Sequence, residues 1–337
     1  MDDEDAAVLP VPEDHEGHMR LSRTRRTIVF RALFIANSIT NYPEEHGRRY
    51  HAFRRGRYLL PNDDKEMQRL DLVDEMIKLT LGGLHLAPIG PNPQRVLDIG
   101  TGSGAPTSIL LQSIPPNVKF LVDDVEEEWE YGSRPFDFIH SRYMVFAIRD
   151  MKHLIQQAFN ALRPGGWLEV QDFDSRINSP DNTIRGTCLE YWNKSTVDAF
   201  ESMGFWTRIG PEYSDLLNDA GFVNIQMKKF PIPLGKWAKD ENYKRLGELN
   251  VKQLTEVLEA ASMAVLTRRD GPSKRYMRCA QAHGMMREIA ESTQSWIWNL
   301  VANKANNLRH HREQDRSIVW ELKAFLSRYI PSSAMRT

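Results

Sequence analysis

The chain has 337 residues, enough for one large domain or two modest ones. Its 44 lysines and arginines nearly cancel its 45 aspartates and glutamates, so the overall charge gives no reason to expect nucleic acid or an anionic membrane as a partner. Two cysteines, an acidic start and the lack of an apolar run near ~18 residues argue against a disulfide framework, a signal peptide and a membrane span. We expect a cytoplasmic protein, with the nucleus as the alternative compartment.

The first part of the chain is acidic and then rich in arginine. Residues 1–20 contain two prolines and few bulky apolar side chains, which predicts disorder. Five arginines follow between positions 20 and 31, and they fit either a nuclear-import patch or the solvated face of a helix. Further on, 47–61 reads GRRYHAFRRGRYLLP, and a helix is predicted from the cap at 62–64 to about Leu81.

The sharpest signal lies between Arg95 and Gly104, which reads RVLDIGTGSG. Its apolar start is typical of a buried parallel strand, interrupted only by Asp98. The glycines that follow at alternate positions are Gly100, Gly102 and Gly104. Without side chains they allow a tight turn and a close approach of the backbone to a ligand.

The next segments alternate between strands and helices. Strands are predicted at 118–122, at 136–140 and at 167–170, with a helix over 151–162. This alternation predicts a parallel sheet covered by helices. Beyond it we expect helices over 183–203 and 211–220, a strand over 222–230, and a mostly helical pattern over 239–330.

Two ligand classes compete for the glycine turn. A dinucleotide would place its pyrophosphate next to the Asp98 carboxylate, where like charges repel. S-adenosylmethionine instead carries an ammonium and a sulfonium, which an acid beside the turn attracts. The residues therefore favour S-adenosylmethionine, and a nicotinamide-dependent oxidoreductase is the weaker alternative.

Five motifs in order make the chain resemble a known family. RVLDIGTGSG, NVKFLVDDVEEEW, FDFIHSRYM, LRPGGWLEVQDF and the upstream GRRYHAFRRGRYLLPNDDKE are similar to segments of the fungal LaeA-like S-adenosylmethionine-dependent methyltransferases, over roughly residues 47–260. The resemblance implies a Rossmann-like α/β fold with a mostly parallel sheet and helices on both faces. On this basis we expect a disordered start (1–20), a helical lid segment (21–94), the methyltransferase core (95–235) and a helical C-terminal region (236–337).

The resemblance also implies which residues hold S-adenosylmethionine. The methionine end and the ribose would be approached by Asp98, Gly100, Thr101, Gly102 and Gly104. The adenine side would be formed by Asp123, Asp124 and Val125, and the rim of the site by His140, Ser141 and Arg142. Tyr58 would cover the cofactor as part of a lid.

Two strands of the family pattern are missing from the expected places. Only residues 105–116 separate the glycine turn from the strand at 118–122, too few for another strand and its crossover. By spacing, Asp123 or Asp124 would bind the ribose, whereas by motif wording the pair lies beside the adenine, and both roles stay open. No closing strand is evident after Arg269, so we expect the second and last strands of the sheet to be shortened or missing.

The functional expectation follows from this mixed pattern. The first hypothesis is an S-adenosylmethionine-dependent methyltransferase of secondary metabolism, which modifies a small metabolite or acts as a LaeA-like regulator with a protein partner. The second is a non-methylating protein of the same fold, a scaffold or a cyclisation or isomerisation catalyst with a degenerate cofactor site. We assign no catalytic residue and no metal site, although His140 and His153 are candidate general bases.

Overall fold

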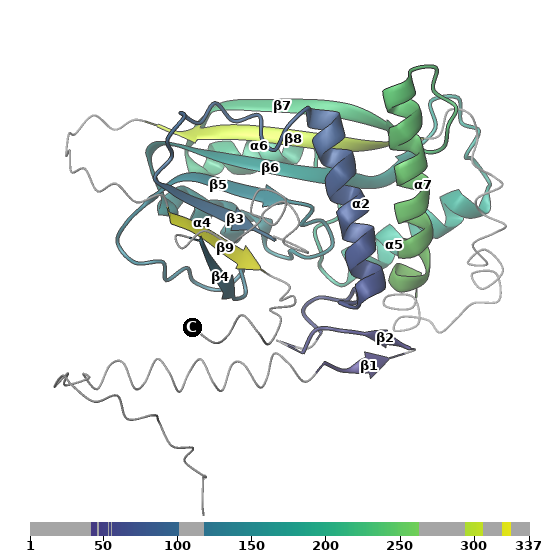
Figure 1. The fold of residues 1–337 in the computed structure, drawn as a ribbon, viewed down its shortest axis with the longest axis horizontal. Helices are drawn as coiled ribbons and strands as arrows, with labels where there is room; N and C mark the ends of the chain where they lie inside the picture. Colours follow the sequence, from purple (N-terminus) through teal and green to yellow (C-terminus); the bar gives the residue numbers. More distant parts are fainter. Residues whose placement is uncertain are drawn as a thin grey trace, which may run out of the picture. The chain divides into compact units, whose positions relative to one another are not determined.

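The computed structural model describes residues 42–45, 47–52, 54, 56–100, 118–262, 294–305 and 319–324, all within one compact unit that starts at Tyr42. Its main feature is a seven-stranded sheet in the order β4-β9-β3-β5-β6-β8-β7 (Figure 1). The strands are β3 (Arg95–Ile99), β4 (Val118–Val122), β5 (Phe136–Arg142), β6 (Leu162–Asn178), β7 (Phe222–Pro233), β8 (Gln294–Lys304) and β9 (Val319–Ala324). A separate small hairpin pairs β1 (Glu44–Glu45) with β2 (Arg48–Arg49).

The centre of the sheet is parallel, as the alternating pattern predicts. β3 pairs with β5 and β5 with β6, so that Asp98 lies opposite His140 and Ser141 lies opposite Val170. The apolar residues of these strands are buried on both faces, as is usual for a parallel sheet. This register brings the carboxyl ends of β3 and β5 side by side.

The expectation of a missing last strand is wrong. β8 runs antiparallel between β6 and β7, with Ile297 opposite Phe173 on one side and Phe230 on the other. Ser295, Ile297 and Asn299 are buried at every second position, the period of a strand. The sequence QSWIWNLVANK has this alternation, and its tryptophans favour a strand. The stretch around it is rich in methionine and charged residues, a pattern that predicts a helical region.

A strand also occupies the place of the second strand that appeared to be missing. β9 lies parallel between β3 and β4, with Trp320 in register with Val96 on one side and Val118 on the other. It supplies hydrogen-bonding partners to two strand edges that would otherwise be open. β9 follows β4 by almost 200 residues, so local spacing could not reveal it. β4 therefore does not lie directly beside β3, and the expectation of a missing second strand is also wrong.

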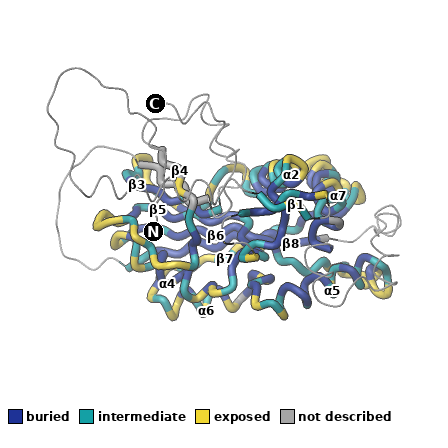
Figure 2. Tube along the Cα trace, turned by 90° about the horizontal axis from the view of Figure 1, so that it is seen from below, coloured by how far each residue is buried: buried dark blue, intermediate teal, exposed yellow. Residues whose placement is uncertain are grey.

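Helices cover both faces of the sheet, which confirms that part of the expected fold (Figure 2). One face carries α2 and α7, and the other carries α4 and α6, with α5 against β6. Their bounds are α2 (Asp64–Leu81), α4 (Met151–Ala161), α5 (Cys188–Ser202), α6 (Pro211–Ala220) and α7 (Glu241–Ala261). The predicted ends hold for α2, where Asp63 accepts a hydrogen bond from the Glu66 amide and Gly82 adopts a left-handed conformation.

The expected division of the chain changes accordingly. Residues 236–337 were expected to form a helical region, yet β8 and β9 belong to the central sheet and only α7 is helical among the described residues of this range. The start at 1–20 lies outside the described residues. Among the helices that the structure describes, none is long and apolar enough to span a membrane.

Candidate functional site

Asp98 and His140 form a close pair at the carboxyl ends of β3 and β5. The Asp98 Oδ1 atom lies 2.6 Å from His140 Nδ1, and the two side chains are 17 % and 12 % exposed. The second ring nitrogen, Nε2, is buried and has no hydrogen-bond partner among the described residues. The pair fixes the direction of the Asp98 carboxylate at the edge of the sheet where α/β proteins bind their ligands.

Gly100 follows directly and has φ +76°, a conformation that favours glycine. A Cβ at this position would lie 2.2 Å from Met144 Sδ, so the methionine side chain packs directly against the glycine. The turn predicted at this point therefore begins as expected. The predicted contacts of Thr101, Gly102 and Gly104 lie outside the described residues.

Asp124 is engaged by two arginines of the upstream segment. Its carboxylate is almost fully buried, and Oδ2 lies 2.9 Å from Arg54 Nη1 and 3.3 Å from Arg57 Nε. Glu127 pairs with the same two guanidinium groups. Arg54 and Arg57 therefore lie at the end of β4, and they already pair with the acid that was predicted for the adenine side.

Of the other predicted residues, Val125, Ser141 and Tyr58 lie in or against the core, and Asp123 lies at its edge. Val125 is fully buried, and its carbonyl accepts hydrogen bonds from Trp129 Nε1 and Gln157 Nε2. Ser141 is also buried. Tyr58 packs against two hydrophobic clusters of the core, and its ring meets the His51 ring edge-on. Asp123 is half-buried and accepts a hydrogen bond from the Asp124 amide.

Arg142 lies at the end of β5, but its guanidinium faces α2. It pairs with Asp74 of that helix, donates 2.7 Å hydrogen bonds to Gln171 Oε1 and to the Leu84 carbonyl, and is buried. All three nitrogens are therefore used to hold α2 and the following loop against the sheet. The residue predicted for the rim is thus engaged by α2 and by the loop that follows it.

A buried ion pair that the sequence analysis did not single out lies beside this region. Arg69 and Glu66 of α2 are 0 % and 1 % exposed and form two hydrogen bonds of 2.6 and 3.0 Å. Arg69 Nη1 also donates to the Tyr143 hydroxyl and to Gln253 Oε1. Burial acts to lower the pKa of Arg69, but the Glu66 carboxylate, together with Tyr143 and Tyr58, raises that pKa above its ordinary value.

Asp172 of β6 is a second buried acid, and it fixes the segment that follows β5. Its carboxylate accepts hydrogen bonds from the amides of Phe173 (2.9 Å) and Met144 (3.0 Å). Burial raises the pKa of Asp172 to about 7, although these backbone hydrogen bonds partly oppose the shift. The residue is positioned to hold the chain rather than to meet a ligand.

Replacing Asp172 by asparagine is expected to cost about 1–3 kcal/mol at pH 5, because an amide can accept only one of the two backbone hydrogen bonds. The pKa of Asp172 in the folded protein lies above the unfolded value of 3.8, so between these two pH values the native state binds one more proton than the unfolded state. The free energy of unfolding of the wild type therefore falls as pH rises from about 4 to about 7. The stability difference between wild type and Asp172→Asn should shrink by up to about 1.4 kcal/mol per pH unit. Urea unfolding of both proteins at pH 5, 6, 7 and 8 measures it; a constant difference would contradict the assignment.

The strand beside β3 ends without an acid. β9 places Leu322 opposite Asp98 and Lys323 opposite Ile99, and the sequence after Ala324 contains no aspartate or glutamate. The resemblance implies a ribose-binding acid at the end of the strand in this place. β9 restores the backbone of the sheet there but not that carboxylate.

The remaining residues fit one end of S-adenosylmethionine better than the other. Asp98, which is oriented by His140 and lies two residues before the left-handed Gly100, suits a positively charged amino-acid group. At the adenine and ribose end, Asp124 is paired with arginines and β9 brings no acid. No cluster of three or more metal-ligating side chains occurs in the described ranges.

Comparison with known proteins gives a consistent result. A family model described as a methyltransferase domain matches residues 46–227. Methyltransferase pytC of Aspergillus terreus is 35% identical over 69% of this chain and 78% of its own length. The secondary metabolism regulator LAE1 of Cochliobolus heterostrophus is 31% identical over 80% of this chain and 93% of its own. The protein-methionine methyltransferase laeA of Emericella nidulans is 28% identical over 70% of this chain and 69% of its own.

Proposed function

The chain belongs to the methyltransferase-domain family that includes the fungal secondary-metabolism methyltransferases, and on that premise we propose that it uses S-adenosylmethionine to methylate a small molecule of secondary metabolism. The observation that carries this proposal is the Asp98–His140 pair beside the Gly100 turn. It places an oriented carboxylate and a left-handed glycine at the ligand-binding edge of the sheet.

The bound cofactor would supply an electrophilic methyl group on a sulfonium. Asp98 would bind the ammonium of its methionine end, because opposite charges attract strongly where solvent is partly excluded. His140 would keep the carboxylate pointed toward that group through its Nδ1 hydrogen bond. The protein's main contribution to the rate would be to position the two reactants.

A second candidate function is supported by the other end of the site. Arg54 and Arg57 occupy Asp124, and Lys323 stands near where an acid is expected. A protein of this kind could keep the fold and act as a scaffold, or as a cyclisation or isomerisation catalyst, without methyl transfer. The regulators among the relatives make a role in control a reasonable form of this candidate.

Transfer of labelled methyl groups separates the candidates. The purified chain is incubated with methyl-labelled S-adenosylmethionine and with a fungal extract divided into a small-molecule fraction and a protein fraction. We expect label in the small-molecule fraction. Label in the protein fraction alone would favour a regulator that methylates protein, and no label in either would favour the non-methylating candidate.

A further inference from the structure

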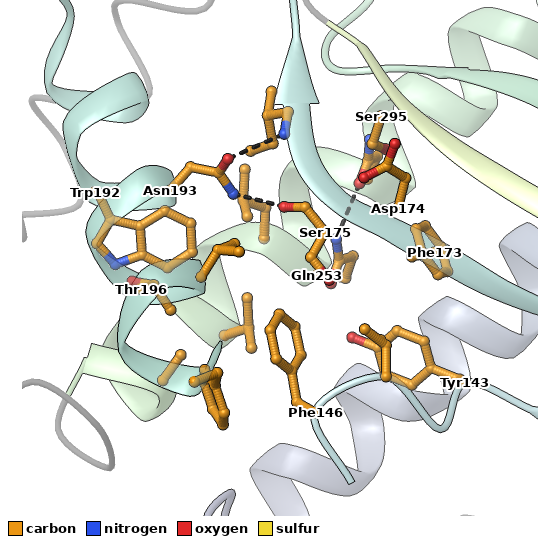
Figure 3. A pocket seen from close by; sticks show the side chains of 18 of the residues that line it. Tyr143, Phe146, Phe173, Asp174, Ser175, Trp192, Asn193, Thr196, Gln253 and Ser295 are labelled. Atoms are coloured by element: carbon orange, nitrogen blue, oxygen red, sulfur yellow. Dashed lines mark hydrogen bonds between the residues drawn. The ribbon is translucent and has the colours of Figure 1, made fainter. Parts of the chain in front are cut away.

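A cavity lies beyond the carboxyl ends of β5 and β6, between these strands and the helices α5 and α7 (Figure 3). Its volume is ≈ 80 Å³, several times the roughly 10–15 Å³ that one water molecule requires. The walls are mostly apolar, and several aromatic rings line them: Tyr143, Phe146, Phe173, Trp192 and Phe200. Apolar walls with a few polar groups are typical of small-molecule sites.

Two hydroxyl groups in this cavity have no partner among the described residues. Thr196 of α5 is 3 % exposed, and its Oγ1 atom makes no hydrogen bond, not even to the preceding turn of its own helix. Ser175 of β6 likewise has a buried, unpaired Oγ atom. A buried hydroxyl without a partner destabilises the folded protein, because its hydrogen bonds to water are lost and not replaced. Both side chains line the same cavity, so one ligand could satisfy both (Figure 3).

The other polar groups around the cavity are already paired, and they fix its shape. Asn193 accepts a hydrogen bond from the Ile177 amide and donates one to the Ser175 carbonyl, which holds α5 against β6. Asn250 donates to Ser295 and accepts from Gln253, which in turn reaches Arg69. The two unpaired hydroxyls therefore lie among polar groups that all have hydrogen-bond partners, not in a loosely packed region.

The backbone beside the cavity is strained. Tyr143 and Phe146 have φ of +53° and +66°, values that are uncommon for bulky side chains. Both side chains line the cavity, and both follow directly after β5, the strand that carries His140. Strain of this kind is kept where the surrounding structure requires a particular arrangement, which is frequent at binding sites. Asp174, which also lines the cavity and is half-buried, adds one more acceptor.

We propose that this cavity binds the methyl acceptor, and that the acceptor is a small, largely apolar ring compound whose hydroxyl group pairs with Thr196 and Ser175. This proposal rests on the proposed methyltransferase function. The ligand hydroxyl would accept a hydrogen bond from one of the two side chains and donate to the other or to Asp174. The apolar remainder would lie against the aromatic walls.

The test compares two probes that differ by one hydroxyl, 4-ethylphenol and ethylbenzene, with ligand-observed NMR on the full chain. We expect wild type to bind 4-ethylphenol more tightly than ethylbenzene. Thr196→Val should weaken 4-ethylphenol by about three- to tenfold and leave ethylbenzene unchanged, since one hydrogen bond is lost. The same variant should unfold at an equal or higher temperature, because it removes an unpaired buried hydroxyl. Ser175→Ala should weaken 4-ethylphenol in the same way.

Thr207→Val is the matched control, because the Thr207 hydroxyl is also buried but donates to Glu201 and lies outside the cavity. It should lower the unfolding temperature and leave both probes unaffected. Equal binding of the two probes by wild type, or unchanged 4-ethylphenol affinity in both Thr196→Val and Ser175→Ala, would overturn the proposal. S-adenosylmethionine binding is measured on the same samples. Its failure alone would overturn the proposed function, and with it the role of the ligand as methyl acceptor, whereas the cavity would still be a binding site for a hydroxylated ring compound.

Discussion

Replacing Glu66 by glutamine is expected to lower the free energy of unfolding by about 3–5 kcal/mol, the largest effect of any single change considered for this chain. The carboxylate lies 2.6 and 3.0 Å from the Arg69 guanidinium, and neither side chain is exposed to solvent. Without the negative charge, the guanidinium stays buried and uncompensated, because its other partners are the neutral Tyr143 hydroxyl and Gln253 amide. Urea unfolding followed by circular dichroism measures the change.

A double-mutant cycle shows whether charge is the cause. Arg69→Met alone should also destabilise the chain, since it leaves the Glu66 carboxylate buried without its partner. The double variant Glu66→Gln with Arg69→Met should cost clearly less than the sum of the single changes, because no isolated charge remains. Additive costs would show that the two residues act independently. Arg245→Met, which breaks an exposed pair with Glu75, serves as a control and should change stability by less than about 1 kcal/mol.

Replacing Asp98 by asparagine is expected to weaken S-adenosylmethionine binding by roughly tenfold to a hundredfold, equivalent to a charge-assisted hydrogen bond of about 1.5–3 kcal/mol. The amide keeps the size of the side chain, and its oxygen can still accept from His140, so the pair at 2.6 Å is largely preserved. What is removed is the negative charge that the cofactor's ammonium would meet. Calorimetric titration of both proteins measures the ratio of dissociation constants.

Two further variants show whether the loss of affinity in Asp98→Asn comes from the loss of its charge. Asp71→Asn removes an exposed acid of α2 and should leave the affinity unchanged. His140→Asn keeps a donor near the position of Nδ1 and should weaken binding less than Asp98→Asn, because His140 acts by orienting the carboxylate. A loss of affinity in His140→Asn equal to that in Asp98→Asn would contradict this positioning role.

The sequence predicted the parallel half of the fold because the evidence there is local. An apolar run before a glycine turn, caps such as Asp63, and strand–helix alternation place β3, β5, α2 and α4 within a few residues. β6 is located by the same evidence but extends well beyond the predicted range of 167–170. β8 and β9 depend instead on pairing with strands far away in the chain. A short segment such as VWELKA has no periodicity long enough to distinguish a strand from a helix, so only the open edges of β3 and β4 reveal where it belongs.

The site was predictable to a similar degree. Asp98 and His140 come from strand ends that the sequence identifies, and their pairing follows from the parallel register. The ion pairs Arg142–Asp74 and Asp124–Arg54 could not be predicted from the sequence, because each joins a strand end to a side chain far upstream in the chain. The Glu66–Arg69 pair did carry a signal: the two residues are three apart on the same helix face as Val73 and Met76, which is buried.

Calorimetric titration of the full chain with S-adenosylmethionine, followed by displacement with S-adenosylhomocysteine, shows whether this fold still binds the cofactor. We expect a single site with a dissociation constant in the micromolar range and competition between the two compounds. We also expect the site to bind although Asp124 is paired with Arg54 and Arg57. The absence of heat and of competition up to millimolar concentration would contradict this expectation, and would leave a methyltransferase fold that no longer binds its family's cofactor.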